Sequence, residues 1–124
     1  MNREIKFRGK RIDNGKWAYG YVRLQPKTGR TIIEWLGEDD MLTFCVVDPE
    51  TVGQFTGLRD DNGKEIYEGD IINFGAQLGS KNEVKFLEIN AGFLVKDKYG
   101  DWKWLYDIVG STNCKIIGNI FEEK

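Results

Sequence analysis

The chain has 124 residues, a hydrophobic fraction of 40% and a formal net charge of −2. That length fits one domain or two small subdomains that share a core, and the apolar content excludes a disordered chain, which could not bury enough surface to offset its ordering entropy. No apolar run approaches the roughly 18 residues that span a bilayer, and none follows the basic N-terminus as in a signal peptide, so we expect a cytoplasmic protein with no membrane contact.

The small net charge conceals a strong segregation along the chain. Residues 1–30 carry nine Lys or Arg against two Asp or Glu, whereas residues 31–70 carry two against eleven. In one interpretation the two segments lie side by side in a sheet or pair across a subunit contact, which would make the protein a homo-oligomer. In the other interpretation the basic segment is a surface for nucleic acid.

The periodicity at the N-terminus is that of β-strands. Apolar and polar residues alternate along residues 4–8, which places Ile5 and Phe7 on one face and turns Arg8 to the other. A second run, residues 17–21, carries three aromatic residues on one shared face. These two runs predict a β-hairpin.

Asn-Gly pairs mark two hairpin turns, one at Asn14-Gly15 and one at Asn62-Gly63. Both lie within the sequence Asp-Asn-Gly-Lys, and Asn-Gly suits the two positive-φ positions of a type I′ turn. A third turn is predicted at residues 98–101. We interpret the repeated sequence as two similar corners rather than two binding sites.

Further strands are predicted where β-branched and aromatic residues gather between turn residues. They are residues 31–35, 42–47, 70–74, 83–89, 92–96, 102–106 and 116–121. A short helical turn is expected at residues 48–52, because Asp48 can cap it, Pro49 fits its first position and Gly53 limits its length. The predicted class is all-β and mainly antiparallel, with at most one or two short helical turns.

No motif in the chain indicates catalysis. Histidine is absent, which removes the Ser-His-Asp and Cys-His arrangements and the commonest metal ligand. Acidic runs at residues 38–40 and at Asp60-Asp61 could supply an acid and a base, but such runs are usually solvated loop tips. Phosphate-binding and calcium-binding motifs are absent as well. We expect a non-enzymatic protein with no catalytic residues, cofactor, metal or small-molecule substrate.

The two cysteines, Cys45 and Cys114, are flanked by apolar residues. Their number and separation do not fit a zinc motif or a CxxC redox pair. We predict buried structural thiols, with a disulfide as the alternative.

One segment near the N-terminus combines residue types that have a binding chemistry. Cations can follow a phosphate backbone while aromatic rings beside them stack on bases, as in single-stranded nucleic-acid sites. The candidate nucleic-acid-binding residues are Lys6, Arg8, Lys10, Arg11, Lys16 and Trp17. The alternative is that the rings are cross-strand partners in the core, which we expect for Trp17 and more strongly for Trp102 and Trp104.

The chain resembles the YopX family in three stretches: MNREIKFRGKRIDNGKWAYGY, then VDPETVGQFTGLRDDNGKEIYEGDII, then KIIGNIFE. The family consists of small proteins encoded by phages and prophages of bacteria. The resemblance implies a mostly β protein with an N-terminal β-hairpin region at residues 1–50 and an SH3-like small barrel at residues 51–124. It implies no activity, because the family has no established function.

These observations lead to two functional expectations. The first is an interaction protein that acts in the bacterial host cell by binding a protein partner or itself, as the charge segregation favours. The second is a nucleic-acid-binding module built on the basic, aromatic N-terminal segment, since small barrels serve both kinds of binding.

Overall fold

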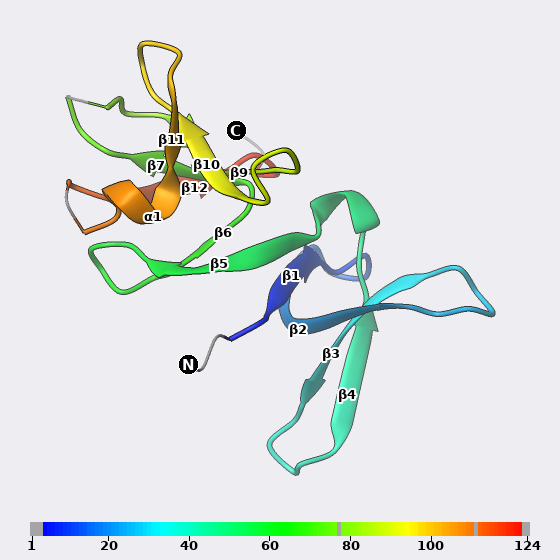
Figure 1. Ribbon diagram of the computed structural model, residues 1–124. Helices are drawn as coiled ribbons and strands as arrows, with labels where there is room; N and C mark the ends of the chain where they lie inside the picture. The colour runs from blue at the N-terminus through cyan, green and yellow to red at the C-terminus, as the bar shows by residue number, and fades with distance from the viewer. Residues whose placement is uncertain (1–3, 77, 111, 123–124) are drawn as a thin grey trace. The chain divides into compact units, whose positions relative to one another are not determined.

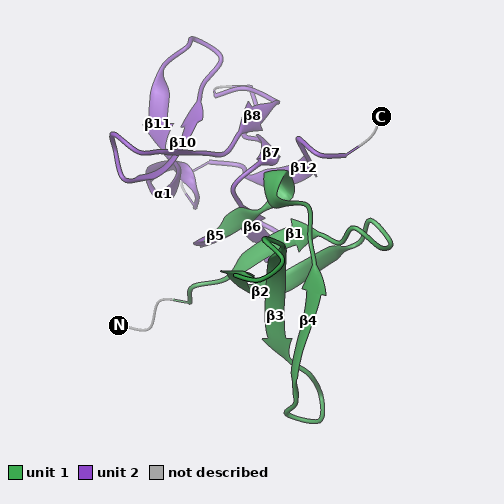
Figure 2. Cartoon of the chain, turned by 90° about the vertical axis from the view of Figure 1, so that its right-hand side faces the viewer, with its two compact units in different colours: residues 1–55 green, residues 56–124 purple. Residues whose placement is uncertain are grey.

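The computed structural model describes residues 4–76, 78–110 and 112–122 (Figure 1). Packing divides the chain into two compact units, residues 1–55 (unit 1) and residues 56–124 (unit 2), which Figure 2 shows in different colours. Strand β5, Gly53–Arg59, begins in unit 1 and ends in unit 2. The strand registers in the described residues are antiparallel. The predicted all-β, mainly antiparallel class is therefore confirmed.

Unit 1 is built on an antiparallel sheet in the order β4-β3-β2-β1-β5. Its strands are β1 (Phe7–Lys10), β2 (Trp17–Leu24), β3 (Thr31–Leu36), β4 (Leu42–Val46) and the first part of β5. A bridge between Arg11 and Val47 also joins the end of β1 to the end of β4. Strand β4 therefore returns to the end of β1, although β2 and β3 separate the two strands in the order of the sheet.

One face of these strands forms the core of unit 1. Its buried residues are Ala18, Ile33, Cys45 and Val47, and Phe7, Val22, Trp35 and Val52 pack against them. Close approach of β2 to β3 depends on Gly20, because a Cβ there would lie 2.1 Å from the carbonyl oxygen of Glu34. Cys45 is a buried free thiol, as predicted.

The predicted helical turn is confirmed as η1, the 3₁₀ turn Pro49–Thr51. The carboxylate of Asp48 caps it by accepting a hydrogen bond from the N–H of Glu50 at 3.0 Å. The hydroxyl of Thr51 donates to the carbonyl of Asp48 at 2.7 Å and accepts from the N–H of Lys10 at 2.8 Å. These bonds fasten the turn to the end of β1.

Unit 2 contains two three-stranded antiparallel sheets, β11-β10-β9 and β12-β7-β8. Its strands are β6 (Glu65–Tyr67), β7 (Asp70–Asn73), β8 (Asn82–Glu83), β9 (Lys85–Leu87), β10 (Gly92–Lys96), β11 (Trp102–Trp104) and β12 (Lys115–Asn119). Strand β6 lies beside the remainder of β5, and a single helical turn, α1 (Leu105–Ile108), follows β11. Among the described residues no ladder joins the two sheets into a closed barrel.

Both sheets and the helical turn contribute to one core in unit 2. Its buried residues are Ile66, Ile72, Phe74, Val84, Val95, Leu105, Ile108 and Cys114. Cys114 is a free and fully buried thiol, as predicted. The absence of a disulfide between Cys45 and Cys114 settles the alternative that the sequence left open.

Two predicted strands of unit 2 are interrupted. The strand predicted at residues 83–89 divides at Val84, whose N–H bonds to the carbonyl of Asp70 and whose carbonyl accepts from the N–H of Gly69. The strand predicted at residues 102–106 ends at Trp104, where α1 begins. One helical turn brings its first and last residues to the same side, and both are buried in the core.

The prediction that Trp102 and Trp104 lie in the core is wrong, because both rings are exposed. In the β10-β11 register Trp104 lies opposite Leu94, and Trp102 lies opposite Lys96. The core residue Val95 lies between Leu94 and Lys96 on β10, so its side chain points to the other face of the sheet. The ring of Trp104 instead covers Gly92, where a Cβ would lie 2.5 Å from it. Register, rather than hydrophobicity, decides which face these tryptophans occupy.

The predicted type I′ turns are also wrong. That turn needs positive φ at both central residues, but only the glycine of each Asn-Gly pair has it, with φ of 71° at Gly15 and 80° at Gly63. The N–H of Gly15 bonds to the carbonyl of Arg11, four residues back, whereas the N–H of Gly63 bonds to that of Asp60, three residues back. The shared Asp-Asn-Gly-Lys sequence therefore forms two different loops.

A closer structural match to the loop at residues 60–64 lies at residues 97–101; we call them the Asp60 loop and the Asp97 loop. In each, the aspartate N–H bonds to the carbonyl four residues later, at 2.9 and 2.8 Å, and the glycine N–H bonds back to the aspartate carbonyl. The aspartate Oδ1 also accepts from the second and fourth following N–H groups, all at 2.9 Å. This is the three-residue hairpin loop with glycine in the left-handed region.

Candidate functional site

The β1-β2 hairpin brings together part of the predicted nucleic-acid site. Lys10 lies directly opposite Trp17 in the register, and Arg8 lies opposite Tyr19 on the same face. The guanidinium carbon of Arg8 is 4.4 Å from the centroid of the Trp17 ring, and Nζ of Lys10 is 5.8 Å from it. Trp17 is half-buried beneath these cations.

Arg8 is not the solvent-facing cation that the alternation predicted. Its side chain is buried, with 5% of the residue exposed, whereas Ile5, which the alternation placed on the opposite face with Phe7, is exposed. The strand begins only at Phe7, so the alternation from residue 4 onward does not describe a strand face. Stacking on an indole ring suits a guanidinium in a partly dry setting, because the planar group is weakly hydrated.

Two other predicted cations are engaged within unit 1. Arg11 and Asp13 form two hydrogen bonds, Nε to Oδ1 at 3.0 Å and Nη2 to Oδ2 at 2.9 Å. This pairing raises the pKa of Arg11 and lowers the pKa of Asp13 from their ordinary values. Lys6 lies 3.4 Å from the carboxylate of Glu4 and 5.4 Å from the centre of the Phe55 ring.

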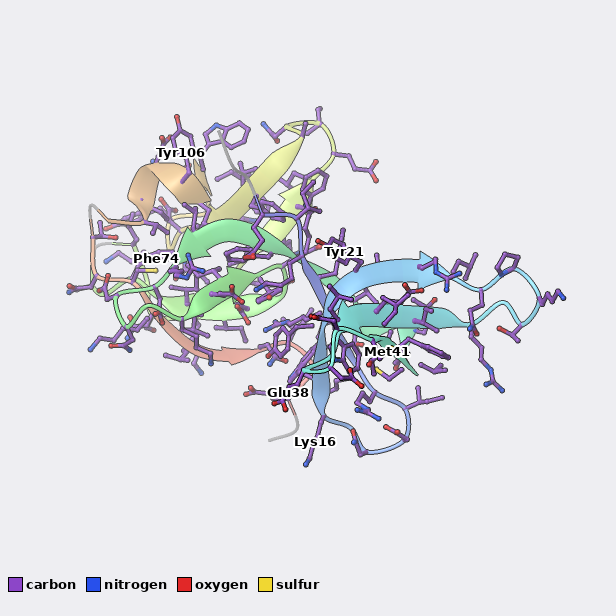
Figure 3. All side chains as sticks on the ribbon, turned by 90° about the horizontal axis from the view of Figure 1, so that it is seen from below. Lys16, Tyr21, Glu38, Met41, Phe74 and Tyr106 are labelled. Atoms are coloured by element: carbon purple, nitrogen blue, oxygen red, sulfur yellow. The ribbon has the colours of Figure 1, made fainter. Side chains whose placement is uncertain are left out.

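Lys16 is the predicted cation with the most open setting, because it lies exposed in the β1-β2 loop (Figure 3). A pocket of about 290 Å³ opens beside this hairpin and is lined by Arg11, Trp17, Ala18, Tyr19 and Trp35. Nucleic-acid binding at these six predicted residues therefore stays a prediction, with fewer available cations than the sequence suggested.

The sequence did not predict the exposed apolar surface on the neighbouring strands. Tyr21, Glu34 and Phe44 lie directly opposite one another across β2, β3 and β4, and Leu36 lies opposite Leu42 on that same face. The four apolar residues are more than half exposed: Tyr21 66%, Leu36 67%, Leu42 65% and Phe44 54%. We call Tyr21, Leu36, Leu42 and Phe44 the apolar face.

Two features surround this apolar face. The only charged residue within its rows, Glu34, is paired with Arg23 and is largely covered. Met41, exposed just before β4 (Figure 3), belongs to the β3-β4 turn, whose tip carries Glu38, Asp39 and Asp40. The signal in the sequence was that residues 41–47 are apolar at both alternating sets of positions, more than a single core face needs.

The acidic run Asp60-Asp61, considered for catalysis, is bound to backbone groups. Asp60 is buried, and its carboxylate accepts from the backbone N–H groups of Asn62, Lys64 and Ile116. Asp61 accepts from the N–H of Cys114 at 2.9 Å. These carboxylates bind backbone donors, which is a structural use. In the described part of the chain, no group of three or more His, Cys, Asp or Glu residues could hold a metal ion.

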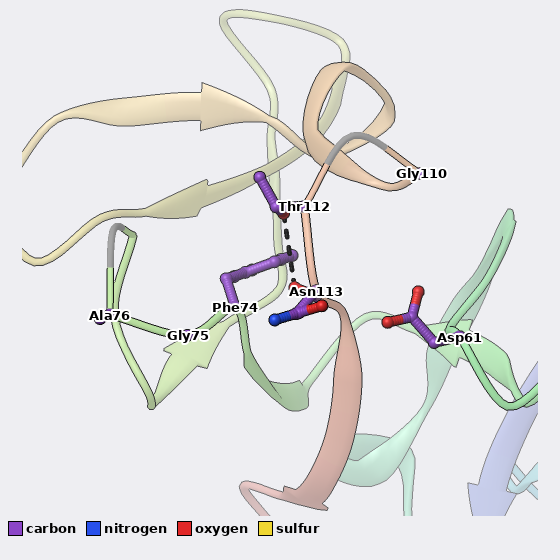
Figure 4. Close-up of a pocket in the computed structure, with 7 residues that line it drawn as sticks. All are labelled: Asp61, Phe74, Gly75, Ala76, Gly110, Thr112 and Asn113. Atoms are coloured by element: carbon purple, nitrogen blue, oxygen red, sulfur yellow. Dashed lines mark hydrogen bonds between the residues drawn. The ribbon is translucent and has the colours of Figure 1, made fainter.

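A second pocket, of about 630 Å³, lies in unit 2 beside Asp61, Phe74 and Asn113 (Figure 4). The hydroxyl of Thr112 donates to the carbonyl of Asn113 at 3.4 Å on its wall. One oxygen of Asp61 on this wall already accepts from the N–H of Cys114, so part of the polar lining is bound within the protein.

None of the described helices is long and apolar enough to cross a membrane.

Together, these features define an all-β protein of two compact units, the first of which exposes an apolar sheet face. Its sequence from residue 6 to residue 124 matches the family model described as YopX protein. The chain therefore belongs to the YopX family, as the resemblance indicated. No curated protein matches its sequence.

Proposed function

We propose that this YopX-family protein is a non-enzymatic interaction protein that binds a protein partner or a second copy of itself through the apolar face. The observation that carries the proposal is the exposure of Tyr21, Leu36, Leu42 and Phe44 on one side of three adjacent strands. Contiguous exposed apolar side chains are the usual mark of a protein interaction site on a soluble domain.

The chemistry of the apolar face favours protein over nucleic acid. Leucine side chains neither stack on bases nor bind phosphate, whereas large apolar and aromatic residues are enriched at the centre of protein interfaces. Glu34, in the middle of the surface, adds negative charge, which is offset by its partner Arg23. A protein surface of matching shape is therefore the better ligand.

From the family we further propose that the protein is encoded by a phage or prophage and acts in the cytoplasm of the bacterial host. Its contribution there is binding rather than catalysis. The complete absence of histidine supports that view, because histidine is the residue most often used for proton transfer at neutral pH.

The test compares two variants of the full chain. The face variant carries Tyr21→Ser and Phe44→Ser, so that it changes both the β2 and the β4 side of the face, and the control carries Ile89→Ser, an exposed apolar residue in unit 2. Proteins captured from a bacterial lysate are identified, purified and titrated against each chain, and self-association is followed by light scattering at low and high salt.

We expect the face variant to weaken the contact at least about tenfold while the control binds like the wild type. The proposal is overturned if the wild type neither self-associates nor binds any protein in a way that the face variant weakens.

Nucleic-acid binding at the β1-β2 hairpin is the second candidate function. It is favoured by the exposed rings of Tyr19 and Tyr21, which lie on the same strand as Trp17. Binding there requires an affinity that falls steeply with salt. If single- and double-stranded DNA and RNA all fail to bind at about 50 mM salt, this candidate is excluded.

A further inference from the structure

Strand β4 is an edge strand of unit 1. In the described residues, β4 forms a ladder with β3 alone. On its other side, Arg11 forms a bridge with Val47, and the N–H of Ile12 bonds to the carbonyl of Val46. The outer edge of residues 42–44 is therefore not covered by a ladder. Edge strands of this kind are where another strand can add to a sheet.

The direction of the backbone groups along β4 follows from two hydrogen bonds. The N–H of Val47 bonds to the carbonyl of Thr31 in β3, whereas the carbonyl of Val46 accepts from the N–H of Ile12 on the outer side. Because backbone groups alternate in an antiparallel strand, the N–H and carbonyl groups of Leu42 and Phe44 also point outward.

The composition of β4 leaves this edge unprotected. Its sequence, Leu-Thr-Phe-Cys-Val, contains neither charge nor proline, which are the usual means of preventing edge-to-edge pairing. The edge strands of the two sheets in unit 2 differ, since β8, β9, β11 and β12 each include a Lys or Glu.

We propose that β4 pairs with β4 of a second copy of this chain, antiparallel and about a twofold axis at Thr43. Leu42 then lies opposite Phe44 of the partner, and the two pairs exchange four backbone hydrogen bonds. The same register places the exposed Leu42 and Phe44 side chains against each other across the axis, so one patch is complementary to itself. Pairing stops at Val46, whose outward carbonyl already accepts from Ile12.

Charges at the two ends of β4 complement this arrangement. Antiparallel pairing brings the acidic β3-β4 tip, residues 38–40, to the far end of the partner's β4. At that end lie the β2-β3 turn with Lys27 and Arg30, the exposed Lys16 and two carboxylates, Asp48 and Glu50, while Arg11 and Asp13 neutralise each other, so the positive charges exceed the negative ones by one. Opposite charges therefore meet twice, once on each side of the axis.

This inference rests on the proposed function, because it names a second copy as the protein that binds at the apolar face. The remaining part of the face, Tyr21 and Leu36, lies on β2 and β3 and stays available in such a dimer. Substitutions at the edge and at the rest of the face can therefore separate the two proposals.

The sharpest test is a cross-link at the axis. In the proposed register the two Thr43 residues are a directly opposed pair without mutual hydrogen bonds, with Cα atoms about 4.5 Å apart, which a disulfide can span. We expect Thr43→Cys to form a disulfide-linked dimer on mild oxidation. The matched control, Leu36→Cys, is exposed on β3, and its two copies would lie about 16 Å apart, too far for a disulfide.

Light scattering on the full chain, at concentrations up to about 100 μM, gives the second readout. We expect the wild type to be a dimer, Phe44→Lys to weaken the dimer at least about tenfold, and Tyr21→Lys to leave it unchanged. Circular dichroism and thermal unfolding check that each variant is folded.

A wild-type chain that is monomeric throughout overturns the inference. So does a dimer that Phe44→Lys leaves intact or that Thr43→Cys cannot cross-link. If the wild type is monomeric but a captured protein is lost with both Phe44→Lys and the face variant, the occupant of the edge is a different protein, and only the proposed function stands.

Discussion

In the Asp60 loop the carboxylates reach beyond their own hairpin, whereas the carboxylate of the Asp97 loop serves its hairpin alone. Oδ2 of Asp60 accepts from the N–H of Ile116 at 3.1 Å. Asp61 accepts from the N–H of Cys114 and donates its own N–H to the Cys114 carbonyl, both at 2.9 Å. The Asp97 carboxylate accepts from the N–H groups of Tyr99 and Asp101, both within residues 97–101.

The difference teaches how one local structure can serve two purposes. Asp-x-x-Gly builds the same loop twice, but only at Asp60 do adjacent carboxylates hold a segment more than fifty residues later in the chain. The run Asp60-Asp61, which resembles a possible acid–base pair in the sequence, is a fastening for the start of β12. The Asp97 loop reaches outside itself through its backbone, where the N–H of Lys98 bonds to the carbonyl of Leu78.

The largest expected effect comes from removing each aspartate. Asp60→Ala leaves the Ile116 donor and two loop donors without their acceptor, so we expect a loss of about 2–3 kcal/mol in the free energy of unfolding. Asp97→Ala affects only loop donors and should cost about 1 kcal/mol. Urea unfolding of both variants measures the two losses. Equal losses would show that the long-range bond contributes nothing.

An intermediate and equal effect is expected at the two loop glycines. Gly63 and Gly100 have φ of 80° and 86°, and a Cβ would meet nothing within 4 Å at Gly63 and only the Lys96 side chain, at 3.8 Å, at Gly100. Gly63→Ala and Gly100→Ala should therefore each cost about 1–2 kcal/mol through backbone strain alone. Asn at either position should cost less, because it tolerates this conformation. A much larger loss at Gly63 would mean that the loops differ locally as well.

The smallest effect at neutral pH concerns the thiol that the Asp60 loop adjoins. Burial raises the pKa of Cys114 from 9.0 to about 11, with smaller contributions from Asp61 and Asp60. Because the folded-state pKa lies above the unfolded one, unfolding releases a proton between these values, and stability falls as the pH rises from about 9 to about 11. Cys114→Ala should lose less stability over this range than the wild type. Parallel slopes in urea unfolding at pH 8, 9.5 and 10.5 would contradict the assignment.

Much of the fold was predictable because its signals are local. Alternation predicted most strands, and Asp48 with Pro49 predicted η1, since a cap and a first-turn proline need only neighbouring residues. The exposed tryptophans and α1 were not predictable in this way. Their positions follow from the register of β11 against β10 and from the need to bury both Leu105 and Ile108.

In the candidate site too, local features were predictable from the sequence and features that depend on tertiary packing were not. Hairpin periodicity brought Arg8, Lys10 and Trp17 together correctly, but burial of the Arg8 guanidinium on the indole ring depends on tertiary packing. The apolar face was missed because β4 is apolar on both sides, and sequence alone does not distinguish a strand buried on both faces from one that exposes a binding surface.

Each compact unit contains one buried cysteine, so each unit carries its own thiol probe of local opening. Cys45 is buried in unit 1 and Cys114 in unit 2, and both are free. Burial raises the pKa of both thiols, so each should react with a thiol reagent only after its surroundings open. The rates of labelling at the two positions therefore report, in the unmodified chain, whether the units open together or one at a time.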